Sequence, residues 1–518
     1  MPAFYQTAVA RLSQTARIMS QINDVFIVSA ARTPIGSFNG VLKNATAPEL
    51  GVVAVKAAIE RAGLKPEQIE EVYMGNVLQG NVGQAPARQV ALKAGCPDST
   101  EATTINKVCA SGMKAISLAA QNIALGQRGV MVAGGMESMS NAPSGYGHVW
   151  LSFRVGLRAQ LPVRADPYRA EVASPPPPRP PRGKGAWTEP NFSSVSPTWP
   201  ARAGSAAFVP LGPLLVRSVG AEAATARVCR KFRLLAGGGE GAQPCWRHSG
   251  KANYYLPRGN SYGHVQALDS IVKDGLHDVY NQVAMGNCAE NTAKKLSITR
   301  EQQDEFAIES YRRSAEAWKA NAFANEIAPV TISDRKGDVV VSEDEEYKNV
   351  KLDKIPTLRP VFDKNGTITA ANASTLNDGA SAVVLASEAE VQKLGVKPLA
   401  KIVAFADAAC APIDFPIAPA YAIPKALERA GLTKDDISLF EINEAFSAVA
   451  LANNQMLGLD ASKVNVLGGG VSLGHPIGSS GARIVVTLAH ALKPGQYGCA
   501  GVCNGGGGAS AIIIKREN

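Results

Sequence analysis

Two stretches of this chain repeat one pattern, and the repeat restricts the possible folds more than any other feature of the sequence. Three landmarks recur in the same order: Asn76, Cys109 and Glu137 in the first stretch, and Asn443, His475 and Cys503 in the second. The first interval is 109 − 76 = 33 residues in one copy and 475 − 443 = 32 in the other. The second interval is 28 residues in both copies, 137 − 109 and 503 − 475. This spacing predicts a duplicated fold in which equivalent loops of the two halves meet at one site.

Within each stretch, short apolar segments alternate with helical ones. Val25–Ser29 and Val130–Ala133 have the apolar character of buried strands, and Glu49–Ala62 has helical spacing that ends at Gly63. A second stretch of the same kind covers residues 400–515. The alternation predicts a layered α/β architecture.

The segment between the two stretches is expected to contain helices and a long loop. Ala289–Lys295 and Glu301–Ala320 have the spacing of amphipathic helices. Val339–Lys354 is charged and is expected to be a loop, whereas Ala380–Ala386 is expected to be a strand.

Residues 144–253 differ from the rest of the chain in composition. They contain 15 Lys+Arg and 5 Asp+Glu with runs of Pro and Gly, and the other residues carry 53 − 15 = 38 bases and 44 − 5 = 39 acids. The formal charge of +9 therefore comes from this segment, and no affinity of the whole chain for nucleic acid follows. Such a composition seldom packs a core, so we interpret the segment as a largely disordered insert. The sequence has no run of about 18 apolar residues, so no membrane span is expected.

The cysteines and the N-terminal residues bear on the location of the protein. Eight cysteines in 518 residues are too few for a disulfide scaffold, so free thiols in a reducing compartment are expected. Residues 1–23 contain Arg11 and Arg17 but no acidic residue, which is typical of a mitochondrial transit peptide. The alternatives are a disordered N-terminus and a cytoplasmic location.

Cys109 is the first candidate for a reactive group. It follows an apolar stretch and precedes Ala110, Ser111 and Gly112, where a helix-forming run begins. The N–H groups and the dipole at a helix N-terminus favour a thiolate, and small neighbours leave room for a substrate. A buried structural cysteine is the alternative for a single Cys.

His475 is the candidate base. It lies between Gly474 and Pro476, and the fixed φ of Pro makes such a loop rigid. Imidazole can take a proton from a thiol or donate a hydrogen bond to a thioester oxygen. A histidine on a solvent-facing loop is the alternative, and His490 fits that role better.

Cys503 and Asn443 complete the set of candidates. Cys503 and Asn504 precede four glycines, whose N–H groups can approach a ligand closely and form an oxyanion hole. A phosphate-binding P-loop is disfavoured because no Lys-Ser/Thr follows, and a zinc site with Cys499 lacks a second ligand pair. The amide of Asn443 can hold a water or fix a histidine, or it can simply cap a strand end.

Together these motifs resemble the thiolase family, and the resemblance covers nearly the whole chain outside residues 144–253. The strings Ala31–Gly36, Gly134–Ser140 and Asn372–Gly379 agree with it as well. Ile413–Pro419 is similar to the mitochondrial, potassium-responsive type of thiolase that acts on acetoacetyl-CoA. The resemblance implies a duplicated αβαβα layered fold, with two similar core domains and a CoA-binding loop domain.

The resemblance also implies domain boundaries. Residues 24–397 would form the N-terminal half, including a loop domain over about residues 139–372. Residues 398–518 would form the C-terminal half. The insert 144–253 interrupts the loop domain, and translated intervening sequence is its simplest explanation.

The activity implied by the resemblance is an acyl transfer, the reversible Claisen condensation of two acetyl-CoA molecules to acetoacetyl-CoA and CoA. Cys109 would carry the acetyl group, His475 would activate its thiol, and Cys503 would remove the methyl proton of the second acetyl-CoA. Asn443 would position a water that forms one oxyanion hole with His475. The N–H groups of Cys109 and Gly505 would form the other.

The resemblance implies no covalent cofactor, CoA as a substrate, and a potassium ion. Contacts to CoA are expected at Tyr311, Asn349, Val350, Lys351, Lys354 and Ser374. The potassium ion would be held by Tyr311 and by the backbone carbonyls of Ala370, Ala371, Ala373 and Val471. The expected partners are acetyl-CoA, acetoacetyl-CoA and CoA, in a homotetramer without nucleic acid or a membrane.

Three alternatives stay open from the sequence. One is a longer-chain 3-ketoacyl-CoA thiolase. Another is a ketoacyl synthase, against which Cys503 argues, since those enzymes typically have histidines or Asn there. The third is a non-catalytic isoform in which the basic insert disturbs assembly or binds a polyanion.

Overall fold

The computed structural model describes residues 23–143, 268–334 and 337–518. The expected transit segment, apart from its last residue, and the expected insert 144–253 lie outside the described residues. Within the described ranges, no helix is long and apolar enough to cross a membrane.

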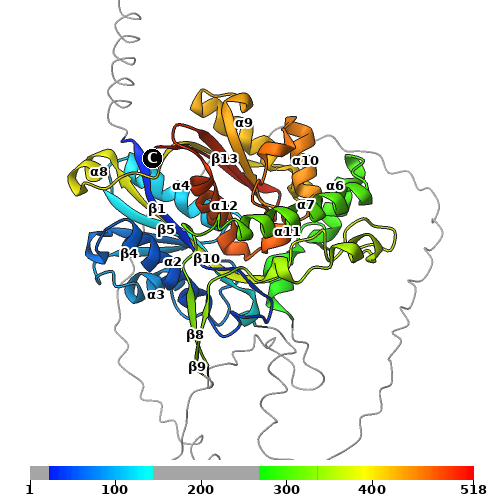
Figure 1. Ribbon diagram of the computed structural model, residues 1–518, viewed down its shortest axis with the longest axis horizontal. Helices are drawn as coiled ribbons and strands as arrows, with labels where there is room; N and C mark the ends of the chain where they lie inside the picture. The colour runs from blue at the N-terminus through cyan, green and yellow to red at the C-terminus, as the bar shows by residue number, and fades with distance from the viewer. Residues whose placement is uncertain (1–22, 144–267, 335–336) are drawn as a thin grey trace, which may run out of the picture. The chain divides into compact units, whose positions relative to one another are not determined.

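A ten-stranded mixed sheet runs through the described part of the chain (Figure 1). Its strands are β1 (Val25–Arg32), β2 (Gly36–Ser37), β3 (Glu71–Gly75), β4 (Glu101–Ile105), β5 (Val130–Ser138), β10 (Asn377–Ser387), β11 (Ala400–Ala409), β12 (Ile437–Ile442), β13 (Tyr497–Asn504) and β14 (Gly508–Arg516). Their order is β12-β13-β14-β11-β1-β10-β5-β3-β4, and β2 pairs with β10. Val25 lies opposite Ile402 in the antiparallel contact between β1 and β11, which joins the two halves.

The same pairing pattern appears on each side of the contact between β1 and β11. In the N-terminal half, β10 is antiparallel to β1 and β5, and β5 is parallel to β3. In the C-terminal half, β14 is antiparallel to β11 and β13, and β13 is parallel to β12. Asn76 directly follows β3, and Asn443 directly follows β12. The duplication predicted from the spacing of the landmarks is therefore confirmed.

Helices form three layers around the two halves of this sheet. The helices of the two halves include α2 (Ala47–Arg61), α3 (Pro86–Lys93), α4 (Ser111–Ala124), α9 (Pro419–Ala430), α10 (Ser447–Leu457) and α12 (Ile477–Ala491). α2 and α3 cover the N-terminal half, and α9 covers the C-terminal half. α4 and α12 lie between the halves and contact strands of both. This is the αβαβα layering that the sequence predicts.

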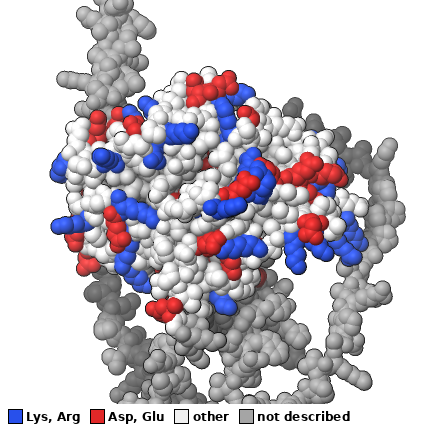
Figure 2. All heavy atoms as spheres, viewed as in Figure 1, with Lys and Arg blue, Asp and Glu red and all other residues white. Residues whose placement is uncertain are grey.

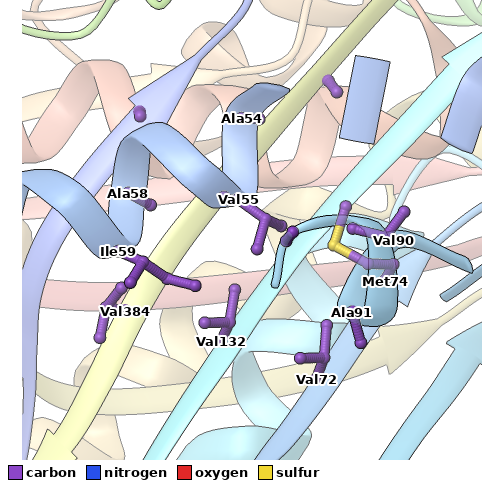
Figure 3. Packing of buried hydrophobic residues seen from close by; sticks show 14 of the residues in the cluster. Ala54, Val55, Ala58, Ile59, Val72, Met74, Val90, Ala91, Val132 and Val384 are labelled. Atoms are coloured by element: carbon purple, nitrogen blue, oxygen red, sulfur yellow. The ribbon is translucent and has the colours of Figure 1, made fainter. Parts of the chain in front are cut away.

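The packing of α2 shows how the sequence pattern creates a layer. The N–H of Thr46 donates to the Glu49 carboxylate at 2.8 Å as the helix begins, and Gly63 follows the end with φ +68°. Between these points, apolar residues recur on one face. Figure 3 shows that face against the sheet and α3, with Ala54, Val55, Ala58 and Ile59 near Val72, Val132, Val384, Val90 and Ala91.

α12 is apolar around most of its surface, and every residue from Ile477 to Ala489 is buried. A helix of this kind belongs between two layers rather than on a surface. Its one buried cation, Arg483, forms an ion pair with Glu441 of β12 at 3.0 Å. The pair fixes α12 to the C-terminal half of the sheet.

The segment between the halves contains α6 (Met285–Lys295) and α7 (Arg300–Lys319), which confirms both expected helices. Arg312 on the exposed side of α7 pairs with Glu309 and Glu316. Basic and acidic side chains are interspersed in the same way over the face drawn in Figure 2.

The expectation of a loop from Val339 to Lys354 is wrong at its start. Gly337–Val341 forms β9, which pairs antiparallel with β8 (Val330–Asp334). Three consecutive β-branched residues favour a strand, and the surrounding charges concealed this preference. The remainder is irregular, with 3-10 turns at Glu346–Lys348 and Leu352–Thr357. Two further short strands, His277–Asp278 (β6) and Val283–Ala284 (β7), precede α6.

Candidate active site

The N-terminal ends of α4 and α12 cross closely, and glycines make the approach possible. A Cβ atom at Gly112 would lie 2.8 Å from the backbone nitrogen of Ala482. In the reciprocal contact, a Cβ atom at Gly481 would lie 2.8 Å from the backbone nitrogen of Met113. The crossing brings together the two segments that lead into these helices, one from each half of the chain.

Cys109 lies in the turn that enters α4, and this turn has an unusual backbone. Val108 has φ +48°, a conformation that costs a β-branched residue on the order of 1–3 kcal/mol. The hydroxyl of Ser111 holds the turn, since it accepts from the N–H of Lys107 at 2.8 Å and donates to the carbonyl of Val108 at 2.6 Å. Strained backbone of this kind is concentrated at functional sites, and here it orients the Cys109 side chain.

The Cys109 thiol is partly buried, and opposing influences act on its pKa. Burial raises the pKa to about 12, and the Glu137 carboxylate adds to the rise. The backbone N–H groups of Cys109 and Gly505 interact with the sulfur and lower the pKa. The resemblance to thiolases implies that these two N–H groups form an oxyanion hole. The resting thiol is protonated at neutral pH, so a base is needed to activate it.

His475 is buried, and both ring nitrogens lie near polar groups. Its backbone N–H donates to the Asn377 side chain at 2.8 Å. Nδ1 lies 2.6 Å from Oγ of Ser480, and Nε2 lies 3.5 Å from Nδ2 of Asn443. Burial, with a smaller contribution from the charge of Arg483, lowers the pKa of His475 to about 3. The ring is therefore neutral at physiological pH and can accept a proton.

Asn443 lies at the end of β12, where its backbone N–H donates to the carbonyl of Gly501 at 3.0 Å. Its Nδ2 faces His475, while its Oδ1 is buried without a hydrogen-bond partner among the described residues. Buried polar atoms are usually paired, so this oxygen is suited to accept from a water or a ligand.

The next residue, Glu444, fixes the loop that carries Asn443. Its buried carboxylate accepts from the hydroxyl of Ser310 and the amide of Asn465, each at 2.7 Å, and from the N–H of Val471 at 3.1 Å. These contacts tie β12, α7 and the segment before His475 into one rigid unit.

Cys503 lies near the end of β13 and is almost fully buried. Burial raises its pKa well above the usual value, and the charge that Cys109 would carry raises it further. The two thiols are therefore close enough to interact. Gly506 and Gly507 follow with φ +83° and +85°, and a Cβ atom at Gly507 would lie only 2.2 Å from the carbonyl oxygen of Cys410. The glycine run is thus required for the turn between β13 and β14.

The residues expected to contact CoA fall into four groups. Tyr311 and Val350 line one surface hollow of about 320 Å³ beside α7. Lys351 and Lys354 are exposed. Ser374 lies near Asn443, where its N–H and hydroxyl both donate to the carbonyl of Ala445, at 3.0 and 2.9 Å. The remaining residue, Asn349, donates to Oγ of Ser37 at 3.1 Å.

The residues expected to hold potassium are partly gathered. Tyr311, Ala371 and Val471 share one buried cluster, and Ala373 belongs to a neighbouring one. Ala370 is exposed.

The electrostatics around Tyr311 are compatible with a cation. Burial raises the pKa of Tyr311 far above its usual value, and the carboxylates of Glu346 and Glu444 raise it further. The phenol is therefore neutral and lies in a field that attracts positive charge. A neutral hydroxyl and backbone carbonyls are oxygen donors suited to an alkali cation.

Three polar residues of the site were not assigned a role from the sequence: Asn377, Ser480 and Glu137. Asn377 holds the backbone of His475, and Ser480 contacts the ring. Glu137 accepts from the N–H of Gly478 at 2.9 Å, in the turn that follows His475. Glu137 is a landmark of the repeat, at the position that corresponds to Cys503. The only sign of a role for Ser480 in the sequence was its position, five residues after His475 and in the first turn of α12.

Comparison with protein families agrees with the repeat and with this geometry. The model of the thiolase N-terminal domain matches residues 25–158 and 233–389, and that of the thiolase C-terminal domain matches residues 396–516. The chain belongs to the thiolase family. The residues between the two N-terminal matches fall inside the segment 144–253, whose limits stay a prediction.

Curated thiolases and a solved structure resemble this thiolase over nearly its whole length. The mitochondrial acetyl-CoA acetyltransferase of Rattus norvegicus is 51% identical over 498 residues, which cover 96% of this chain and 92% of the relative. The mitochondrial acetyl-CoA acetyltransferase A of Xenopus laevis is 48% identical, with 98% of each chain covered. The Acat5 thiolase from Ascaris suum, solved in complex with coenzyme A, superposes with a TM-score of 0.72 at 41% identity, covering 95% of this chain and 100% of that one. The names of the curated relatives confirm the predicted mitochondrial location.

Proposed function

We propose that this thiolase is an acetyl-CoA C-acetyltransferase, which condenses two acetyl-CoA molecules to acetoacetyl-CoA and CoA and catalyses the reverse thiolysis. The names of its relatives support this substrate, and the complex of the Ascaris suum thiolase supports CoA binding. The observation that carries the proposal is the pair of interacting thiols, Cys109 and Cys503, together with the buried, neutral His475 in the segment that leads into α12.

The first half of the reaction transfers an acetyl group to Cys109. Nε2 of His475 takes the thiol proton, and the sulfur attacks the carbonyl carbon of acetyl-CoA. The N–H groups of Cys109 and Gly505 stabilise the oxyanion that forms. The bond between this carbon and the CoA sulfur then breaks, and the leaving thiolate takes a proton from Cys503. Acetyl-Cys109, free CoA, an imidazolium and the Cys503 thiolate result.

The second half forms the carbon–carbon bond. The Cys503 thiolate takes a methyl proton from the second acetyl-CoA, and the enolate oxygen is held by Nε2–H of His475 and a water positioned by Asn443. The carbanion attacks the acetyl carbonyl of Cys109, the carbon–sulfur bond breaks, and acetoacetyl-CoA leaves. The Cys109 thiolate takes back the proton of the imidazolium. Both thiols and the neutral histidine are thereby restored.

The electrostatics of the two thiols set the order of these steps. A charge on Cys109 raises the pKa of Cys503, so the two cannot easily be thiolates together. Acetylation makes Cys109 neutral and removes this repulsion. Cys503 thus becomes available as a base only after the acetyl group is in place, which prevents unproductive deprotonation.

The finer contacts of CoA and of potassium are part of the proposal. We assign the nucleotide end of CoA to Asn349, Val350, Lys351, Lys354 and Tyr311, and the pantetheine arm to Ser374. The potassium ion would be held by Tyr311 and the carbonyls of Ala370, Ala371, Ala373 and Val471, where it would supply a fixed positive charge beside the CoA site. A homotetramer is the expected assembly, and its mass in solution can be measured by analytical ultracentrifugation.

The decisive test compares two half-reactions in purified variants. Cys109→Ala should lower acetoacetyl-CoA thiolysis by at least about 10³-fold and abolish covalent acetylation by acetyl-CoA. Cys503→Ala should still acetylate Cys109, because solvent can protonate the leaving CoA thiolate, but it should lower condensation by about 10²–10⁴-fold. Cys96→Ala, at a buried cysteine in the core beneath α2 and α3, is the matched control and should retain both activities. Normal thiolysis by Cys109→Ala would refute the assignment.

The potassium proposal has a separate test. Replacing potassium by sodium at equal ionic strength should lower thiolysis in the wild-type protein, and Tyr311→Phe should reduce the difference between the two salts. Equal rates in both salts would contradict the proposed ion site, whatever the outcome for the cysteines.

A further inference from the structure

Ser480 is a buried residue in the first turn of α12, only 2% exposed, and its hydroxyl has two partners. Oγ lies 2.6 Å from Nδ1 of His475 and 3.0 Å from the backbone carbonyl oxygen of Pro476. Both distances are within the range of ordinary hydrogen bonds. The hydroxyl is therefore a bridge between the imidazole and its own turn of helix.

The direction of each hydrogen bond follows from counting protons. A hydroxyl has a single hydrogen to donate, and the Pro476 carbonyl can only accept. Ser480 therefore donates to Pro476 and accepts from Nδ1–H of His475. A neutral imidazole carries one proton, so Nε2 has the lone pair. The amide Nδ2 of Asn443, a donor, lies 3.5 Å from Nε2, which agrees with this assignment.

We propose that Ser480 is a positioning residue that holds His475 as the Nδ1–H tautomer, so that Nε2, the nitrogen that faces Asn443, is the acceptor of the Cys109 proton. The inference rests on the proposed function, since it concerns the base of the acetyl-transfer step. It adds a residue to the site that makes no contact with the acyl group.

A hydroxyl has a different effect here from the carboxylate that orients histidine in a Ser-His-Asp triad. A buried carboxylate stabilises the imidazolium, whereas a neutral hydroxyl fixes the tautomer without adding negative charge. The Ser480 proton is also committed to a carbonyl, so the bridge cannot pass a proton onward. The proton taken from Cys109 therefore stays on Nε2, where it can return to Cys109 when acetoacetyl-CoA is released.

Three variants separate positioning from a structural role. Ser480→Ala removes the acceptor of Nδ1–H, and Ser480→Thr retains it. Ser479→Ala is the matched control, because Ser479 lies in the same turn, is 1% exposed, and bonds the hydroxyl of Ser381 at 3.0 Å instead. In rapid-quench measurements, Ser480→Ala should acetylate Cys109 about 10- to 100-fold more slowly than wild type, part of the 10²–10⁴-fold that a general base supplies. Ser479→Ala and Ser480→Thr should stay within about threefold of wild type.

The pH dependence of alkylation gives a readout that a structural defect would not produce. Iodoacetamide modification of Cys109, followed by peptide mass spectrometry, should be slower in Ser480→Ala at pH 7. The difference should shrink as the pH rises toward the pKa of the thiol, because hydroxide then replaces the base. A rate lowered equally at every pH would mean that Ser480 only shapes the fold, and this outcome would overturn the proposal.

The outcome for Ser480 is distinguishable from that of the proposed function. If the wild-type protein did not catalyse thiolysis, the proposed function would fail before any variant was compared. If wild type is active and Ser480→Ala acetylates Cys109 at the same rate, only the role of Ser480 is refuted. Should Ser480→Thr fold poorly because of its extra methyl group, the alkylation profile of Ser480→Ala decides the question alone.

Discussion

Replacing Gly112 by Ala should weaken catalysis by forcing α4 and α12 apart. The added Cβ atom would lie 2.8 Å from the backbone nitrogen of Ala482 and 3.1 Å from the carbonyl oxygen of Gly478. Ordinary van der Waals contact begins at 3.4 Å, so the helices must separate by about 0.6 Å (3.4 − 2.8) at the closer point. Both obstacles are backbone atoms, which cannot rotate aside. The overpacking should cost about 1–3 kcal/mol of folding free energy.

The same displacement acts on the reacting groups. Cys109 precedes α4 and His475 precedes α12, so separation of the helices lengthens the path of the proton between them. A misplacement of about 1 Å can cost on the order of 10²-fold in rate, so 0.6 Å should cost about 10- to 100-fold in kcat/KM for thiolysis.

Two measurements on Gly112→Ala test this reasoning. The midpoint of thermal unfolding should fall by roughly 1–4 °C, while kcat/KM falls much more than the fraction of unfolded protein explains. Gln121→Ala, at an exposed position of the same helix, is the control and should change neither quantity. Unchanged kcat/KM in a folded Gly112→Ala variant would refute the claim that the helix spacing sets the geometry of the site.

Three further predictions concern buried ionisable groups. Arg32→Met should leave the carboxylates of Glu326 and Asp344 buried without their cation and destabilise the fold by about 3–5 kcal/mol, measured by denaturant unfolding; an unchanged midpoint would contradict it. Because the pKa of His475 is lowered to about 3, the pH profile of kcat/KM should show no decrease centred near pH 6.5. A decrease to half the maximal kcat/KM near pH 6.5 would contradict the lowered pKa. The same shift means that, between pH 6.5 and 3, the unfolded chain binds a proton that the folded chain does not. The free energy of unfolding should therefore decrease as the pH is lowered from 6.5 to 3, and it should decrease more in wild type than in His475→Asn.

Sequence reasoning can locate the parts of the candidate site that depend on backbone conformation. Cys109 and His475 each precede a helix, and Asn443 follows a strand, so each can be placed from the alternation of apolar segments and glycines. Cys503 is placed by the glycines that follow it, because the turn they form is closed to other residues. Each of these positions can be recognised from its neighbours in the sequence. The repeat then predicts that the loops carrying them lie close together in the fold.

The sequence does not reveal side-chain contacts between distant segments. Asn377 holds the backbone of His475 from 98 residues away, and neither segment carries a sign of its partner. Ser480 is close to His475 in sequence, yet the direction of its hydroxyl depends on the first turn of α12. The strand β9 was missed for a related reason. Its pairing with β8 stabilises a strand even though charged residues surround it in the sequence.

The two halves use equivalent positions for different purposes, and this explains how one site arises from a repeat. Cys503 in the C-terminal half corresponds to Glu137 in the N-terminal half by spacing. Glu137 accepts from the side chain of Asn76 at 2.8 Å and from the N–H of Gly478 at 2.9 Å. The landmarks of the N-terminal half, apart from Cys109, therefore brace the turn that follows His475. A symmetric pair of sites would need each half to supply both the reacting groups and their support. Here one half supports a loop of the other, because the turn that follows His475 is held by a carboxylate that the proposed reaction does not use.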